Sequence, residues 1–179
     1  MEKLTSPVTR QDGFTLVEVL TAMVLATVLM TLAATALRTY WLNRSVLAAR
    51  AEVVAEMRRV QAQAVSESHP LSFGIRVKVG SSDWDVVRYD PGTDLASVAD
   101  DTCTSTPRKF STGVVVSAAS FDPPPGITVS KCPQASGSAF AFFYARGTAT
   151  AGDLTVRQPA VSRTESLRVI GLTGKVREL

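Results

Sequence analysis

Gly13-Phe14-Thr15-Leu16-Val17-Glu18 begins the stretch that decides the fold of this chain. It opens an apolar run from Phe14 to Leu37 in which Glu18 carries the one formal charge. About 20 apolar residues suffice for a helix to cross a bilayer, and this run is slightly longer. A carboxylate inside such a segment is costly unless an opposite charge meets it. The run therefore predicts a membrane-spanning helix that contains one acid in need of a partner.

Two simpler interpretations of the apolar run stay open at this point. It could be a plain single-pass anchor, or an ordinary secretory signal, because Ala34-Thr35-Ala36 resembles a small-residue signal peptidase site. The run is longer than the usual apolar region of a signal, which spans roughly 7–15 residues. A signal would also have no use for Glu18.

The stretch from Gly13 to Glu18 resembles the cleavage motif of type IV prepilins and type II secretion pseudopilins, together with the polar leader before it and the apolar run after it. In that family a membrane aspartic peptidase cuts after the glycine and N-methylates the new terminal phenylalanine. The resemblance implies a leader peptide at 1–13, cleavage between Gly13 and Phe14, and methylation of Phe14. It also implies that Glu18 acts in assembly by neutralising the N-terminus of a neighbouring subunit.

The orientation of the helix follows from this resemblance rather than from charge. Lys3 and Arg10 precede the run, whereas Arg38, Arg44 and Arg50 follow it, and counting bases alone favours the opposite orientation. The family places the N-terminus in the cytoplasm. We therefore expect a single-pass protein of the inner (cytoplasmic) membrane that later enters a periplasmic or cell-surface filament.

The helix is predicted to continue beyond the membrane, from about Phe14 to about Ser66, because no Gly or Pro occurs before Pro70. Apolar residues recur every three or four positions in its second half, which predicts one buried stripe. The stripe consists of Leu42, Val46, Ala49, Val53, Met57, Val60 and Ala64. Ser68-His69-Pro70 ends the helix.

Alternation and turn residues predict several strands after the helix. In 71–79, Leu71, Phe73, Ile75, Val77 and Val79 are expected to face the core, and Ser72, Arg76 and Lys78 to face solvent. Further strands are expected over 84–89, 113–121, 126–130, 140–144, 153–158, 167–172 and 175–179, with 91–111 as a surface loop. A helix followed by hairpin-connected strands predicts an α+β fold, in which the long N-terminal helix packs on an antiparallel β-sheet. By resemblance this is the type IV pilin fold, with a membrane or filament-core half at 14–41 and a globular domain at 42–179.

The C-terminal part resembles the GspH/FimT family of minor pilins and pseudopilins. The resemblance is carried by 142–147, by 153–156 and by the closing hairpin at 169–177. Some members of this family bind DNA through a basic C-terminal region during natural transformation, with a Gly-Arg-x-Arg-like motif. Gly174-Lys175-Val176-Arg177 resembles that motif, with Lys in place of the first Arg. The last 26 residues carry five bases and two acids, a net charge of +3, so Lys175, Arg177 and Arg168 are candidate DNA-binding residues.

Two cysteines, Cys103 and Cys132, suit one disulfide in an exported protein, with a pair of free thiols as the alternative. The one histidine, His69, has no second histidine near the cysteines, so we predict no metal site and no cofactor. No Ser or Cys lies at motif spacing from His69 and an acid, and Gly171 and Gly174 belong to a hairpin rather than a phosphate loop. The sequence thus predicts a non-catalytic minor pilin or pseudopilin. Its expected partners are other pilins or pseudopilins, the prepilin peptidase and the membrane, with DNA uptake as the alternative function.

Overall fold

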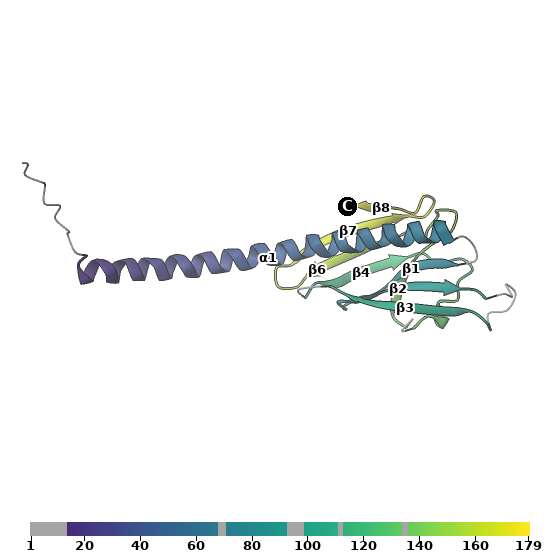
Figure 1. Ribbon diagram of the computed structural model, residues 1–179, viewed down its shortest axis with the longest axis horizontal. Coiled ribbons are helices and arrows are strands. Elements are labelled where there is room, and N and C mark those ends of the chain that lie inside the picture. The colour runs from purple at the N-terminus through teal and green to yellow at the C-terminus, as the bar shows by residue number, and fades with distance from the viewer. Residues whose placement is uncertain (1–13, 68–70, 93–98, 111–112, 134–135) are drawn as a thin grey trace, which may run out of the picture. The chain divides into compact units, whose positions relative to one another are not determined.

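The computed structural model describes residues 14–67, 71–92, 99–110, 113–133 and 136–179. The chain divides into two compact units, Met1–Thr39 and Tyr40–Leu179. One helix, α1 (Leu16–Glu67), contributes to both units (Figure 1). The expected leader at 1–13, including Gly13, and the expected helix end with His69 lie outside the described residues.

The first part of α1 is apolar on every side. Its large side chains are exposed in the isolated chain, as Leu25 (64%) and Met30 (71%) illustrate. The threonine hydroxyl groups within it are satisfied by helix carbonyls, for example Thr27 Oγ1 to the Val24 carbonyl at 2.8 Å. By length and composition, α1 can cross a membrane.

The second part of α1 buries the predicted stripe. Six of the seven stripe residues are at most 2% exposed, namely Val46, Ala49, Val53, Met57, Val60 and Ala64. Leu42 is half-buried, and Val54 and Ser45 widen the buried face. The three-to-four-residue periodicity therefore identified the packed face correctly.

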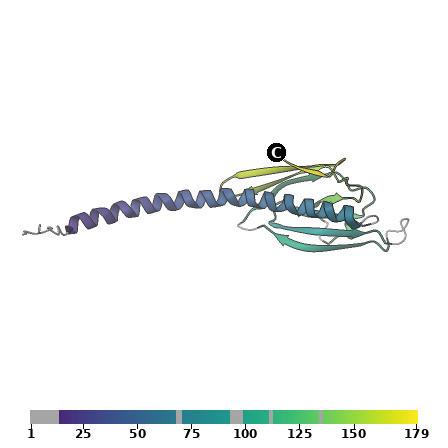
Figure 2. The ribbon, with the colours of Figure 1, turned by 45° about the horizontal axis from the view of Figure 1, so that its top comes forward.

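Eight strands form two antiparallel four-stranded sheets rather than a single one. Sheet A has the order β3-β2-β1-β5 and contains β1 (Ser72–Lys78), β2 (Asp83–Asp90), β3 (Thr102–Lys109) and β5 (Ser138–Phe143). Sheet B has the order β4-β6-β7-β8 and contains β4 (Val115–Phe121), β6 (Gly152–Gln158), β7 (Arg163–Ile170) and β8 (Lys175–Glu178). Figure 2 shows β1 to β3 (teal) and the C-terminal strands (yellow) flanking the second part of α1. The structure confirms the predicted α+β class, a long N-terminal helix packed on antiparallel sheets.

One hydrophobic core joins the second part of α1 to both sheets. Sheet A contributes Phe73, Ile75 and Trp84 among others, and sheet B contributes Leu154 and Val169 among others. Of the residues predicted to face inward from the first strand, Phe73, Ile75 and Val77 are buried here, and Leu71, just before β1, is partly buried against the same core. Val79 was placed wrongly, because it lies past the end of β1 and is 52% exposed.

A second cluster lies on the opposite face of sheet A. It consists of Val87, Tyr89, Cys132, Phe140 and Phe142. Strand residues alternate between faces, so these side chains point away from Phe73 and Trp84. The segment that follows β4 covers them through Ile127 and Val129, and a disulfide from Cys132 to Cys103 of β3 fixes that cover (S–S 2.04 Å).

Three sequence predictions for sheet A and its cover were wrong. Ser72 and Arg76 are buried rather than exposed, because β1 is covered on both faces. The segment 126–130 is not a strand: it contains the start of the 3-10 helix η1 (Val129–Lys131). The expected loop at 91–111 contains edge strand β3, which pairs with β2 along its whole length.

Candidate functional sites

The start of α1 is held by its own side chains. Thr15 stands just before the helix, and its Oγ1 accepts a hydrogen bond from the Glu18 amide at 3.3 Å. This is the threonine side of a capping box, in which a Ser or Thr before the helix serves an amide three residues later. A carboxylate in the first turn, as at Glu18, also complements the helix dipole. Thr15 and Glu18 thus initiate the helix.

Phe14 and Glu18 lie on the same side of α1. Together with Val19, Ala22 and Met23 they line an open groove along the helix. Phe14 is 80% exposed, and no ion pair of Glu18 occurs within the described part of the chain. The arrangement therefore presents an accessible apolar residue and a carboxylate side by side at the beginning of the helix.

The candidate DNA-binding bases lie on the face of sheet B that points away from the core. Val176 of β8 is 5% exposed, and the two bases beside it in sequence, Lys175 and Arg177, are exposed. Arg177 stands directly opposite Arg168 of β7. The structure thus brings the three predicted bases to one surface.

Arg168 already has a partner, which the sequence did not reveal. Its Nε and Nη2 donate to the two carboxylate oxygens of Asp153 at 2.7 and 2.9 Å. These hydrogen bonds hold the pKa of Asp153 below its usual value and raise the pKa of Arg168. Asp153 and Arg168 face each other across β6 and β7, a pairing that depends on strand register. The positive charge around Arg168 therefore comes mainly from Lys175 and Arg177.

The other charges of the C-terminal segment are balanced locally. Glu165 accepts from Arg163 at 2.8 Å and from Arg50 of α1 at 2.8 Å, and Arg50 also binds Glu178 at 2.7 Å. Arg163 therefore does not join the surface formed by Lys175 and Arg177. The net charge of the C-terminal segment, summed along the sequence, is therefore larger than the positive charge on the surface formed by Lys175 and Arg177.

The turn that precedes Lys175 is fixed to α1. Gly174 has φ +59°, and a Cβ atom there would lie 2.5 Å from Gln61 Nε2 and 2.6 Å from the Gly147 carbonyl oxygen. Gln61 Nε2 donates to the Thr173 carbonyl at 3.1 Å. Only glycine fits this position, both for its conformation and for its space. The motif Gly174-Lys175-Val176-Arg177 therefore has a packing role whatever it binds.

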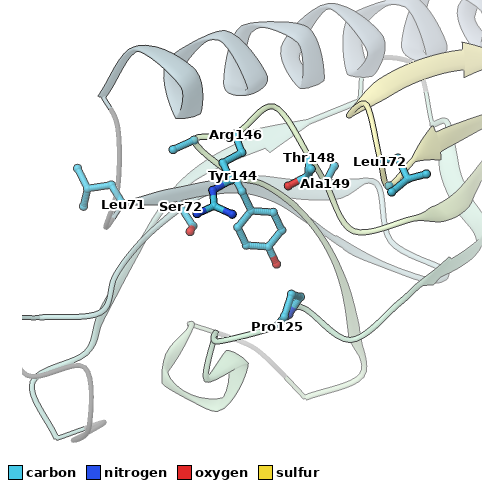
Figure 3. Close-up of a pocket in the computed structure, with 10 residues that line it drawn as sticks. Leu71, Ser72, Pro125, Tyr144, Arg146, Thr148, Ala149 and Leu172 are labelled. Carbon is cyan, nitrogen blue, oxygen red and sulfur yellow. The ribbon is translucent and has the colours of Figure 1, made fainter.

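A hollow of about 660 Å³ lies beside the same hairpin (Figure 3). Apolar residues such as Leu71, Pro125 and Leu172 form much of its lining, and Arg146 is exposed at it. The Tyr144 hydroxyl points toward Pro125 in Figure 3 and has no hydrogen-bond partner among the described residues. Burial raises the pKa of Tyr144 to about 12. Within the described ranges, no group of three or more His, Cys, Asp or Glu side chains could hold a metal ion.

The architecture described above, a long N-terminal helix on antiparallel sheets, agrees with the α+β fold predicted from the sequence. Residues 8–34 match the family profile described as the prokaryotic N-terminal methylation motif. This match covers Gly13, Phe14 and Glu18, and with the architecture it supports the type IV pilin and pseudopilin superfamily.

No curated protein matches this chain. Among solved structures, the chain is similar to the minor pseudopilin EpsH from the Type 2 Secretion System of Vibrio cholerae, with 12% identity and a TM-score of 0.49. That similarity covers 75% of this chain and 96% of the other.

Proposed function

We propose that this chain is a minor type IV pilin or type II secretion pseudopilin, a non-catalytic subunit of a filament. One observation carries the proposal: the methylation-motif match at 8–34 includes the start of a helix whose first part is apolar on all sides. Such a surface needs lipid or other subunits around it. In this proposal, 1–13 is a leader, 14–41 spans the membrane and later enters the filament core, and 42–179 is the periplasmic or extracellular domain.

The proposed maturation is cleavage between Gly13 and Phe14, followed by N-methylation of Phe14. It is tested by expressing the chain together with a prepilin peptidase and measuring the intact mass of the membrane-bound product. We expect loss of residues 1–13 and the added mass of one methyl group. Replacing Gly13 with Leu should leave the precursor uncut, and a mature chain that begins at Leu37 would instead identify a secretory signal.

Glu18 is proposed to pair with the N-terminus of a neighbouring subunit. Glu18→Ala should insert into the membrane at least as well as the wild type, because a costly charge has been removed. It should be depleted from sheared filaments, because the pairing charge is gone. Glu52→Ala, an exposed glutamate in the second part of α1, is the matched control and should assemble normally.

A second function, weak DNA binding during uptake, is favoured by the exposed bases Lys175 and Arg177 beside Arg168. Lys and Arg contacts to phosphate release counterions, so affinity should be micromolar or weaker and should fall steeply with salt. Lys175→Gln/Arg177→Gln should lower the affinity and flatten the salt dependence by about one unit of slope per lost contact. Duplex titrations at two salt concentrations test this, with Arg58→Gln/Arg88→Gln as the control. Equal binding by both double variants would leave the structural role alone.

A further inference from the structure

The globular unit carries a basic groove where α1 enters it. The groove lies between the first turns of α1 in this unit and Arg163 at the start of β7, and its volume is about 530 Å³. Its lining consists of Tyr40, Asn43, Arg44, Leu47, Ala48 and Arg163. Two of these residues are cationic and none is acidic, so an anion is the complementary ligand.

The polar groups of this basic groove are arranged as donors. Arg44 Nη1 donates to the Tyr40 hydroxyl oxygen at 3.1 Å, which leaves the phenolic proton available to a ligand. Arg163 uses Nε and Nη2 to bind Glu165 Oε1 at 3.1 and 2.8 Å. Its Nη1 makes no hydrogen bond to the described residues. Guanidinium groups with free N–H donors suit the oxygens of a phosphate.

The charge of Glu165 does not cancel the basic groove. Glu165 is bound on its other oxygen by Arg50 at 2.8 Å, so two guanidinium groups share this carboxylate. The side chain of Glu165 is only 14% exposed, whereas that of Arg163 is 39% exposed. Glu165 therefore orients Arg163 rather than competing for the groove.

The neighbouring aromatic residues indicate where the groove lies relative to lipid. Tyr40 and Trp41 follow the apolar run within one helical turn, and they are 55% and 61% exposed. Tyrosine and tryptophan concentrate at the membrane–water interface, at the level of the headgroups. Tyr40 also lines the basic groove. When the apolar run spans a bilayer, we therefore expect the groove at the depth of the lipid phosphates.

We propose that the basic groove binds the phosphate of an anionic phospholipid through Arg44, Arg163 and the Tyr40 hydroxyl group. The inference rests on the membrane insertion contained in the proposed function. Lipid binding would also account for the basic residues that follow the apolar run, whose number opposes the charge bias expected for the proposed orientation.

The test uses Trp41 as a reporter in the full chain reconstituted into vesicles. Vesicles of phosphatidylcholine brominated near the headgroup quench Trp41, whereas Trp84 is 1% exposed within the core and supplies a constant background. Non-brominated phosphatidylglycerol is then added in steps at low salt. Recovery of fluorescence steeper than the mole fraction of added lipid measures enrichment of phosphatidylglycerol at Trp41.

The wild type should prefer phosphatidylglycerol over phosphatidylcholine, and Arg44→Gln/Arg163→Gln should lose this preference. The expected loss is roughly fivefold per arginine, because a basic side chain at an anionic surface contributes about 1 kcal/mol. Arg58→Gln/Arg88→Gln removes two exposed arginines elsewhere and should retain it. Thermal melts of both variants check that the fold is intact.

Each outcome decides one point. An unchanged preference in Arg44→Gln/Arg163→Gln, with quenching intact, would overturn the lipid site and leave the proposed function standing. Absence of quenching in pure brominated phosphatidylcholine would show that Trp41 does not reach the bilayer, and would overturn the membrane insertion and the lipid site together. Loss of the preference in both double variants would show a general charge effect and would also refute a specific groove.

Discussion

Sheets A and B share one core against α1 but differ on their opposite faces. The back face of sheet A is covered by the segment after β4 and holds a second cluster that includes Tyr89 and Phe142. The outer face of sheet B bears polar and charged side chains such as Thr155, Arg168 and Lys175. Sheet A is therefore covered on both faces, whereas the outer face of sheet B is exposed.

The two sheets each contain a cross-strand Arg–Asp ion pair, and the two pairs differ in burial. Arg76 and Asp85 face each other across β1 and β2, and Asp153 and Arg168 face each other across β6 and β7. The chemistry is the same, yet the side chains are 4% and 7% exposed in the first pair and 46% and 54% exposed in the second. Burial decides what an ion pair contributes, because removing one partner inside leaves an uncompensated charge.

The strongest test of the comparison removes one acid from each pair. Asp85→Asn should lower the free energy of unfolding by about 3–5 kcal/mol, since it removes the charge of the carboxylate that faces the buried Arg76 guanidinium. Asp153→Asn should change it very little, because water solvates Arg168. Urea unfolding of the full chain in detergent, followed by Trp84 fluorescence, measures both. Equal losses of stability in the two variants would show that burial does not decide what these ion pairs contribute.

Reduction of the disulfide should affect sheet A alone. Cys103 and Cys132 are 29 residues apart, and opening a loop of that size costs about 3–4 kcal/mol by loop-closure entropy. We expect a lower melting temperature and faster amide exchange in β3 and in the cover of sheet A, with β6 and β7 unchanged. A uniform increase in exchange over both sheets would contradict the assignment of the cover to one sheet.

Two tyrosines on the back of sheet A should respond in opposite directions. The Tyr144 hydroxyl is buried with no hydrogen-bond partner in the described part of the chain, so Tyr144→Phe should stabilise the fold by about 1 kcal/mol. The Tyr89 hydroxyl binds Asp101 and accepts from the Thr128 amide at 3.1 Å, so Tyr89→Phe should destabilise it by about 1–3 kcal/mol. Thermal melts compare them, and a destabilised Tyr144→Phe would reveal a partner for that hydroxyl.

The smallest effect concerns the exposed pair on sheet B. Its hydrogen bond from Arg168 lowers the pKa of Asp153 from 3.8, so the folded state releases this proton more readily. The small stabilisation is present above pH 3.8 and is lost as the pH falls through the lower folded value. Carboxyl NMR titration should show the shift, and Arg168→Gln should return the pKa toward 3.8. A titration unchanged by Arg168→Gln would remove this cause.

The helix and most strands were predictable because their signals are local. Spacing of three or four residues identified the buried stripe of α1, and alternation identified the inward residues of β1. Edge strand β3 was missed because Thr102–Lys109 has no apolar alternation and contains Pro107. Proline and lysine are tolerated, and even useful, on an edge strand.

The covered face of sheet A could not be read from the sequence, because the cover comes from a distant segment. Arg76 looks like a solvent-facing residue until Asp85 and Phe140 are placed beside it. Ile127 and Val129 looked like strand residues, yet they pack as an irregular cover.

The candidate sites likewise include one that local sequence predicts and one that depends on tertiary structure. The motif from Gly13 to Glu18 is contiguous and needs no structure to be recognised. Asp153 as the partner of Arg168 depends on the register of β6 and β7, which the sequence does not specify.

Gly174 links the two ends of the globular unit. Through it the closing hairpin touches Gln61 of α1, which adds a contact between the last strands and the helix to the ion pairs of Arg50. Unfolding of the final turns of α1 should then release the hairpin at the same time, and the unit should melt in one cooperative step. A bulky residue at 174 would separate these events, so that the C-terminus frays while the rest of the core stays closed.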